Sequence, residues 1–367
     1  MRVTFPRMGA LDLTFNTLFK QLGAEVVPPP PATKATLALG VKHAPEFACL
    51  PLKLMLGNFI QAVELGADTI VMCGGCGPCR LGHYAQVQQQ ILEDLGYRAR
   101  IVVLEASVCD LLPKIRHLAP HKSWREILRA INIAWVKMNA SDGIESLMLK
   151  IRPRAVKPRA VTEIYEQGLQ LLAAAHTVEE IRTAHRETFA AVKALPLRAE
   201  KPLLRIGIVG ELFVALEPLV NQEIERRLGE LQVEVKRTLY VSEWVRSHLL
   251  WSRQARKQRR AVKDAAQPYL GHWVGGHGLE SIGRTIQLAQ AGFDGVIQVL
   301  PFTCMPEIVA KSILPQISKD YGMPVMTLVL DEHAGEAGIM TRIEAFVDLL
   351  ERRRKQEDVR YERIFGS

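Results

Sequence analysis

The 367-residue sequence lacks any apolar run of the roughly 18 residues that a membrane-spanning helix requires, so we expect no contact with a membrane. Residues 1–15 also lack the apolar core and small-residue cleavage site of a signal peptide. We therefore expect a cytoplasmic protein, in a compartment where disulfides are rare. Zinc-finger spacing and RNA-binding aromatic motifs are missing too, which argues against nucleic acid as a partner.

The sequence has no complete nucleotide-binding loop. The P-loop pattern G-x-x-x-x-G-K-[ST] does not occur, and GIVGE at Gly207–Glu211 is only part of the pattern G-x-G-x-x-G. A glycine turn of this kind more often lets a helix and a strand pack closely. A nucleophile elbow and a credible Ser/His/Asp set are absent as well, which excludes the usual serine hydrolases.

Acidic residues are fewer than basic ones, so the net charge is +8 and the isoelectric point is about 9.2. Much of the excess lies in RQARKQRRAVK, Arg253–Lys263. One interpretation is the solvated face of a helix. The alternative is a contact with an acidic partner or with the phosphates of a substrate.

Strand-like and helix-like segments alternate in two parts of the chain. The first part holds RVTF, DTIVM and RIVVLEAS, and the second holds LLRIGIVG, VEVKRTLYV, GFDGVIQVLPF and MPVMTLVLD. Such alternation predicts parallel sheets. Between them, Ser123 with Glu126 and Thr177 with Glu180 form capping-box signatures of helices. We predict an α/β fold with two Rossmann-like doubly wound parallel-sheet domains, 1–121 and 202–367, and a helical segment, 122–201, between them.

Cysteine is scarce, and its positions are therefore informative. The residues are Cys49, Cys73, Cys76, Cys79, Cys109 and Cys304. Cys73, Cys109 and Cys304 each follow the carboxyl end of a predicted strand, the edge where open α/β sheets bind ligands. Cys49 and Cys304 each lie just before a proline that opens a predicted helix. The N-terminus of a helix stabilises a thiolate.

The spacing of Cys73, Cys76 and Cys79 indicates a metal centre. It matches the first three positions of the bacterial ferredoxin run C-x2-C-x2-C-x3-C-P, whose fourth cysteine is missing here. Further ligands would come from the other three cysteines. Zinc, redox-active thiols and inert buried thiols are the alternatives, although His83 is not at a standard zinc spacing.

Five segments together resemble a known family. They are EFACLPLKLMLGNF, CGGCGPCRLGHY, IGIVGELFV, LPFTCMPE and DEHAGEAGIMTRIEAF. They are similar to the 2-hydroxyacyl-CoA dehydratase superfamily, and most of all to its activase-associated branch of DUF2229 type. The resemblance implies oxygen-sensitive [4Fe-4S] clusters between Rossmann-like domains. It also implies a separate ATP-hydrolysing activase of actin/Hsp70 type, a dimer with its own [4Fe-4S] cluster, as the electron donor.

Three hypotheses about function follow from the resemblance. In the favoured one, all six cysteines hold a double-cubane [8Fe-9S] cluster, three for each cubane, and the chain is an ATP-dependent reductase component acting on a small-molecule substrate. In the second, three cysteines hold a single [4Fe-4S] cluster and the chain is a dehydratase-like subunit acting on an acyl-CoA. In the third, the chain is a non-catalytic electron-transfer or scaffold subunit.

Five charged or titratable residues lie near the cysteines in the sequence: Glu46, Lys53, Arg80, His83 and Glu307. They are candidates to supply charge or protons around the cluster. The alternative is a structural or solvent-facing role for each of them. Since the implied activase is a dimer, we expect a homodimer as its two-fold partner.

Overall fold

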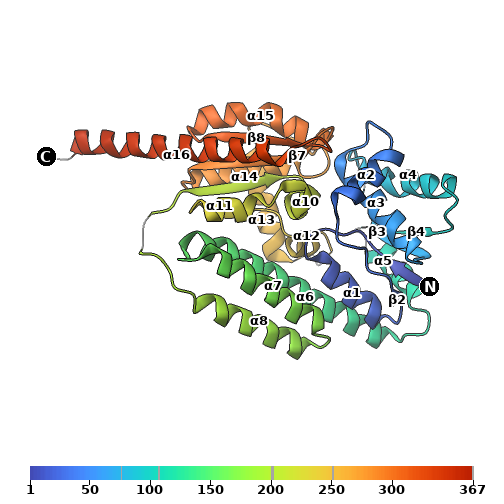
Figure 1. The fold of residues 1–367 in the computed structure, drawn as a ribbon. Coiled ribbons are helices and arrows are strands. Elements are labelled where there is room, and N and C mark those ends of the chain that lie inside the picture. The colour runs from blue at the N-terminus through green and yellow to red at the C-terminus, as the bar shows by residue number, and fades with distance from the viewer. Residues whose placement is uncertain (76, 106–107, 200–201, 250–251, 366–367) are drawn as a thin grey trace.

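The computed structural model describes residues 1–75, 77–105, 108–199, 202–249 and 252–365, without the side chains of residues 108–110, 248 and 357–365. Figure 1 shows two α/β units and a group of long helices beside them. We call them the N-terminal unit (β1 to α5), the helical segment (α6 to α8) and the C-terminal unit (β5 to α16).

The N-terminal unit contains a four-stranded parallel sheet in the order β2-β1-β3-β4. Its strands are β1 (Arg2–Thr4), β2 (Glu25–Val26), β3 (Thr69–Cys73) and β4 (Arg100–Leu104). Its helices are α1 (Leu11–Gln21), α2 (Lys34–His43), α3 (Leu50–Glu64), α4 (Leu81–Asp94) and α5 (Val108–Leu118). The predicted strand DTIVM is β3, which pairs Cys73 with Leu104 of β4 at its carboxyl end.

The C-terminal unit repeats this strand order as β6-β5-β7-β8, again entirely parallel. Its strands are β5 (Arg205–Gly210), β6 (Glu234–Arg237), β7 (Gly295–Pro301) and β8 (Val325–Leu330). Its helices are α9 (Leu212–Leu216), α10 (Pro218–Asn221), α11 (Ile224–Glu230), α12 (Val241–His248), α13 (Arg253–Ala266), α14 (Gly278–Gln290), α15 (Met305–Tyr321) and α16 (Glu336–Phe365). The last helix projects beyond the rest of the molecule (Figure 1).

The helical segment consists of α6 (Trp124–Ile151), a 3-10 turn η1 (Arg152–Arg154), α7 (Pro158–Ala174) and α8 (Val178–Lys193). The three helices pack side by side around their own apolar core, which includes Ile144 and Leu172 (Figure 1). Both predicted capping boxes are confirmed. Ser123 caps α6 with Glu126, and Thr177 caps α8 with Glu180.

The predicted fold class is confirmed, because both sheets are parallel and helices connect their strands. In each sheet the chain starts at an inner strand, β1 or β5, and then switches side. The switch points therefore lie between β1 and β3 and between β5 and β7, where such sheets bind ligands at their carboxyl ends. The domain bounds at residues 121 and 201 stay predictions.

The two units share one hydrophobic core. A single cluster of buried side chains runs from Leu54 and Met72 of the N-terminal unit to Ile206 and Val299 of the C-terminal unit. This continuity holds the carboxyl edges of the two sheets in a fixed relation, which matters for residues contributed by both. Among the described residues, none of the helices has the length and apolarity needed to cross a membrane.

Candidate functional site

Three cysteines from the two units lie at the N-termini of helices. Cys49 is the N-cap of α3, Cys304 is the N-cap of α15, and Cys79 lies just before Arg80, the N-cap of α4. The charge of a Cys79 thiolate would act on Cys49, and that of a Cys49 thiolate on Cys304, so the three sulfurs share one region. Each helix adds partial positive charge and unpaired N–H groups there. The arrangement suits a negatively charged group.

Cys49 is the most buried of these thiols, with 7% of the residue exposed. Its sulfur is hydrogen-bonded to the hydroxyl of Tyr84 in α4. Burial, and then the charge of Glu211, raise the pKa of Cys49 to about 11, although Tyr84 and the backbone of Leu52 work in the opposite direction. Burial and Glu211 also raise the pKa of Cys304. A metal bound here would therefore have to displace protons from the thiols.

Glu211 lies beside all three thiols and comes directly after β5, at the switch point of the second sheet. It caps α9, because its carboxylate accepts hydrogen bonds from the N–H of Phe213 at 3.0 Å and of Val214 at 2.9 Å. Burial raises its pKa. Its segment has the pattern of a glycine turn, which does not point to Glu211, although Glu211 follows a strand, as Cys73 and Cys304 follow predicted strands. We call Cys49, Cys79, Cys304, Tyr84 and Glu211 the cysteine site.

Of the other three cysteines in the predicted ligand set, only Cys73 has a described side chain. Cys73 ends β3 with an exposed side chain, and the charged group acting on it is Glu105. Cys76 and the side chain of Cys109 lie outside the described residues. Among the residues that are described, no group of three or more His, Cys, Asp or Glu side chains is arranged to hold a metal ion. The six-cysteine ligand set therefore stays a prediction.

The loop that carries Cys79 is packed against the C-terminal unit through glycine. Gly77 has φ +84°, and a β-carbon on it would lie 2.4 Å from the ring of Trp273. Gly275 has φ +89°, and a β-carbon on it would lie 3.0 Å from Cγ of Pro78 and 3.0 Å from the backbone nitrogen of Cys79. Only glycine combines this conformation with such close contact. Residues 273–275 therefore help to position the cysteine site.

We expect Gly77→Ala to destabilise the protein by about 2 kcal/mol or more, because the new methyl group meets the Trp273 ring in a backbone conformation that disfavours alanine. Gly96→Ala is the matched control, since Gly96 has φ +83° with no atom within 4 Å of an added β-carbon. Urea unfolding of both variants separates the cost of packing from the cost of conformation. Equal losses would mean that the contact with Trp273 contributes nothing.

Two of the predicted charged neighbours have structural partners. Nζ of Lys53 lies 2.5 Å from a carboxylate oxygen of Glu332, an ion pair that links α3 to the loop after β8. Arg80 donates a hydrogen bond from its guanidinium to the backbone oxygen of Phe47 at 2.9 Å. Glu46 and His83 are exposed. Whether any of these residues acts on a bound group stays a prediction.

Glu307 is the predicted neighbour that lies deepest, with none of its surface exposed. Its carboxylate accepts hydrogen bonds from Ser281 at 2.9 Å and from Gln298 at 2.8 Å. Burial raises its pKa to about 7, against the effect of these two donors. A buried carboxyl group with this pKa, one helical turn after Cys304, is suited to hold or release a proton near neutral pH.

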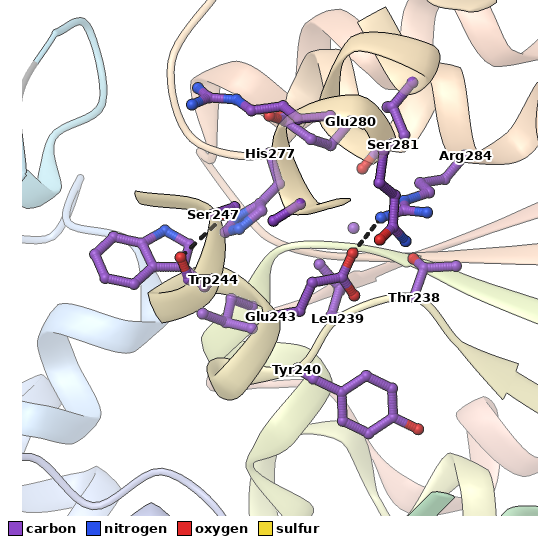
Figure 2. A pocket seen from close by; sticks show the side chains of 16 residues that line it. Thr238, Leu239, Tyr240, Glu243, Trp244, Ser247, His277, Glu280, Ser281 and Arg284 are labelled. Carbon is purple, nitrogen blue, oxygen red and sulfur yellow. Dashed lines mark hydrogen bonds and ion pairs between the residues drawn. The ribbon is translucent and has the colours of Figure 1, made fainter. Parts of the chain in front are cut away.

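A small pocket of about 80 Å³ opens at the carboxyl ends of β5 and β6 (Figure 2). Its wall includes the ion pair between Arg284 and Glu243 and the side chain of Ser281. Ser281 therefore faces this pocket and also donates to Glu307. The contact connects the pocket to the helix that Cys304 begins.

Residues 8–73, which contain Cys49 and Lys53, are the part of the chain that resembles a known family. They match the model of the CoA enzyme activase uncharacterised domain (DUF2229). The match ends at Cys73 and so covers α1 to β3 of the N-terminal unit. It supports the activase-associated part of the resemblance and a partnership with a separate activase. No curated protein matches the chain.

Proposed function

We propose that this chain is the dehydratase-like component of a CoA enzyme activase system and that Cys49, Cys79 and Cys304 hold an iron–sulfur cluster between its two units. The observation that carries the proposal is that three cysteines, each at the N-terminus of a different helix, share one region beside Glu211. The match of residues 8–73 to an activase-associated family supports it.

The chemistry of the donor set suits such a group, although these three thiols are not arranged around a single metal ion in this structure. Thiolates are the usual ligands of iron–sulfur clusters, and three of them leave one iron of a [4Fe-4S] cluster without a cysteine. Neither Cys49 nor Cys304 makes a capping hydrogen bond through its side chain. The partial positive charge of each helix end therefore lies beside the sulfur atom and favours a thiolate there. The cluster would supply single electrons at low potential.

The protein groups around the thiols have distinct tasks in this proposal. The helix ends stabilise negative charge, and Trp273 keeps the Cys79 loop against the C-terminal unit. Tyr84 fixes Cys49 through its hydroxyl. Glu211 and Glu307 are the carboxyl groups close enough to the thiols to exchange protons with whatever binds there. The activase would donate electrons from outside, and the substrate would be an acyl-CoA.

A second candidate is the double-cubane reductase, which needs Cys73, Cys76 and Cys109 as well. The observation in its favour is the spacing Cys73-x-x-Cys76-x-x-Cys79 on one loop between β3 and α4. Cys73 favours the single cluster instead, because the charge that acts on it is that of Glu105 and not that of Glu211, which acts on the other three thiols.

The deciding experiment measures iron and acid-labile sulfide per chain after purification without oxygen, together with an EPR spectrum of the reduced protein. The single-cluster proposal expects about four iron and four sulfide atoms. About eight iron and nine sulfide atoms would favour the double cubane. Zinc in place of iron, or no metal after reconstitution with iron and sulfide, would refute both.

A further inference from the structure

A cavity of about 680 Å³ lies where the N-terminal unit, the helical segment and the C-terminal unit meet. Its walls come from the loop between β1 and α1, from the end of α6 with η1 and α7, and from α9 to α11 (Figure 1). Its volume lies within the range typical of small-molecule sites. Within the described part of the chain, no cysteine is among its lining residues, so the cavity is separate from the cysteine site.

Most of the charged groups in the wall are paired with one another. Four of its arginines form ion pairs with carboxylates of the same wall: Arg7 with Asp12, Arg226 with Glu223, Arg227 with Glu336, and Arg237 with Glu145 and Glu225. These pairs account for their own charges and leave no need for a ligand.

Arg152 is the exception among the described arginines of this wall. Only 6% of the residue is exposed, and its Nε is fully buried without a hydrogen-bond partner. Its stem packs on Gly229, where an added β-carbon would lie 2.9 Å from Cδ, so the side chain has little room to turn away. A buried guanidinium without a partner is costly. The terminal N–H groups of Arg152, and not the enclosed Nε, are the donors that the cavity offers to a carboxylate.

Glu225 offers the opposite charge beside it. One carboxylate oxygen accepts from Arg237 at 3.1 Å, but Oε1 is buried without a partner. The charge of Glu225 acts on Arg152, so the two groups lie near each other although they form no ion pair. Both residues line the cavity, so a ligand beside them would accept hydrogen bonds from Arg152 and meet the negative charge of Glu225. The buried hydroxyl of Thr162 is unpartnered as well.

The overall charge and the apolar residues of the wall restrict the class of ligand that the cavity can bind. It contains seven carboxylates against five guanidinium groups, which disfavours a polyanion such as a nucleotide triphosphate. Apolar surface comes from Leu13, Met148 and Leu149, among others. We propose that this cavity binds an α-amino acid with an apolar side chain, with its carboxylate on Arg152 and its ammonium group on Glu225.

Calorimetric titration of the full-length chain tests the proposal with matched probes. L-phenylalanine, L-methionine and L-valine carry both charges, whereas 3-phenylpropionate and 2-phenylethylamine each carry one. We expect saturable binding of at least one amino acid, at one site per chain, and at least tenfold weaker binding of both single-charge probes. Equal binding of 3-phenylpropionate and L-phenylalanine would refute the role of Glu225. Failure of all three amino acids to bind would leave a water-filled cavity and overturn the proposal.

The variant Arg152→Gln isolates the proposed carboxylate contact. We expect about 10- to 100-fold weaker binding of the amino acid, the usual effect of losing a charged hydrogen-bond partner. The thermal midpoint of the ligand-free variant should not fall, because Arg152 has no ion pair to lose. Arg182→Gln on the exposed face of α8 is the control and should change neither value. Unchanged affinity in Arg152→Gln would refute the assignment. None of these measurements depends on iron, so they fail or succeed independently of the proposed cluster.

Discussion

Replacing Cys304 by alanine should remove most of the iron from protein purified without oxygen, and Cys49→Ala and Cys79→Ala should do the same. The reason is that these three thiols lie at three helix ends and share one region, so the loss of one leaves a cluster with too few ligands. Iron per chain and absorbance near 400 nm, where thiolate-ligated clusters absorb, give the measurement. Far-ultraviolet circular dichroism should be unchanged, since Cys304 makes no capping hydrogen bond.

Cys73→Ala is the matched control, because Cys73 is an exposed thiol close in sequence that faces Glu105. The single-cluster proposal expects this variant to keep its iron. If Cys73→Ala loses as much iron as Cys304→Ala, the ligand set is larger than the cysteine site, and the double cubane becomes the better hypothesis. If Cys304→Ala keeps its iron, the proposed site is wrong.

Glu332→Gln should lower the free energy of unfolding by about 3 kcal/mol, because it leaves the ammonium group of Lys53 buried without a counter-charge. The side chain of Lys53 is only 5% exposed, so water cannot replace the lost carboxylate. Replacing both partners, as in Lys53→Met with Glu332→Leu, should recover most of this loss, since no charge then remains to be desolvated. Urea unfolding of the three variants provides the comparison.

The same ion pair predicts a pH dependence. Burial alone would raise the pKa of Glu332, but the hydrogen bond and the charge of Lys53, together with a backbone hydrogen bond and the charge of His333, outweigh burial and hold this pKa below its ordinary value of 4.5. A carboxyl group with a lowered pKa stabilises the fold above pH 4.5 and loses that contribution as the pH falls through the lowered value. Glu332→Gln should therefore flatten the acid side of the stability profile. The exposed pair of Glu179 with Arg186 is the control, and Glu179→Gln should leave the profile unchanged.

Local patterns were sufficient to predict the fold class. Strands such as β3 and β7 are short apolar runs bounded by glycine and proline, and their alternation with helices requires parallel sheets. The positions of Cys49 and Cys304 at helix N-termini also followed from local sequence, because a proline marks the first turn of each helix.

Contacts between distant segments could not be predicted in this way. Lys53 was a candidate for a role near a cluster, but its partner Glu332 lies 279 residues away and no local pattern announces it. Cys73 and Cys79 look equivalent in the sequence, yet Cys73 is still part of β3 while Cys79 precedes α4, so their side chains meet different surroundings. The spacing of cysteines on a loop shows which thiols could act as ligands. The backbone conformation of that loop decides which of these thiols lie near one another.

The two units contribute the cysteines of the site at different positions along the chain, and this order has a consequence for how the site forms during synthesis. Cys49 and Cys79 emerge early in synthesis, whereas Cys304 and its helix emerge only after most of the C-terminal unit has been made. A ribosome-bound N-terminal unit therefore exposes an incomplete set of thiols to oxygen and to stray metal ions. Insertion of a cluster would have to wait for the second sheet to dock, and once inserted the cluster would fasten the two units together. A fragment that ends before Cys304 should fail to retain iron.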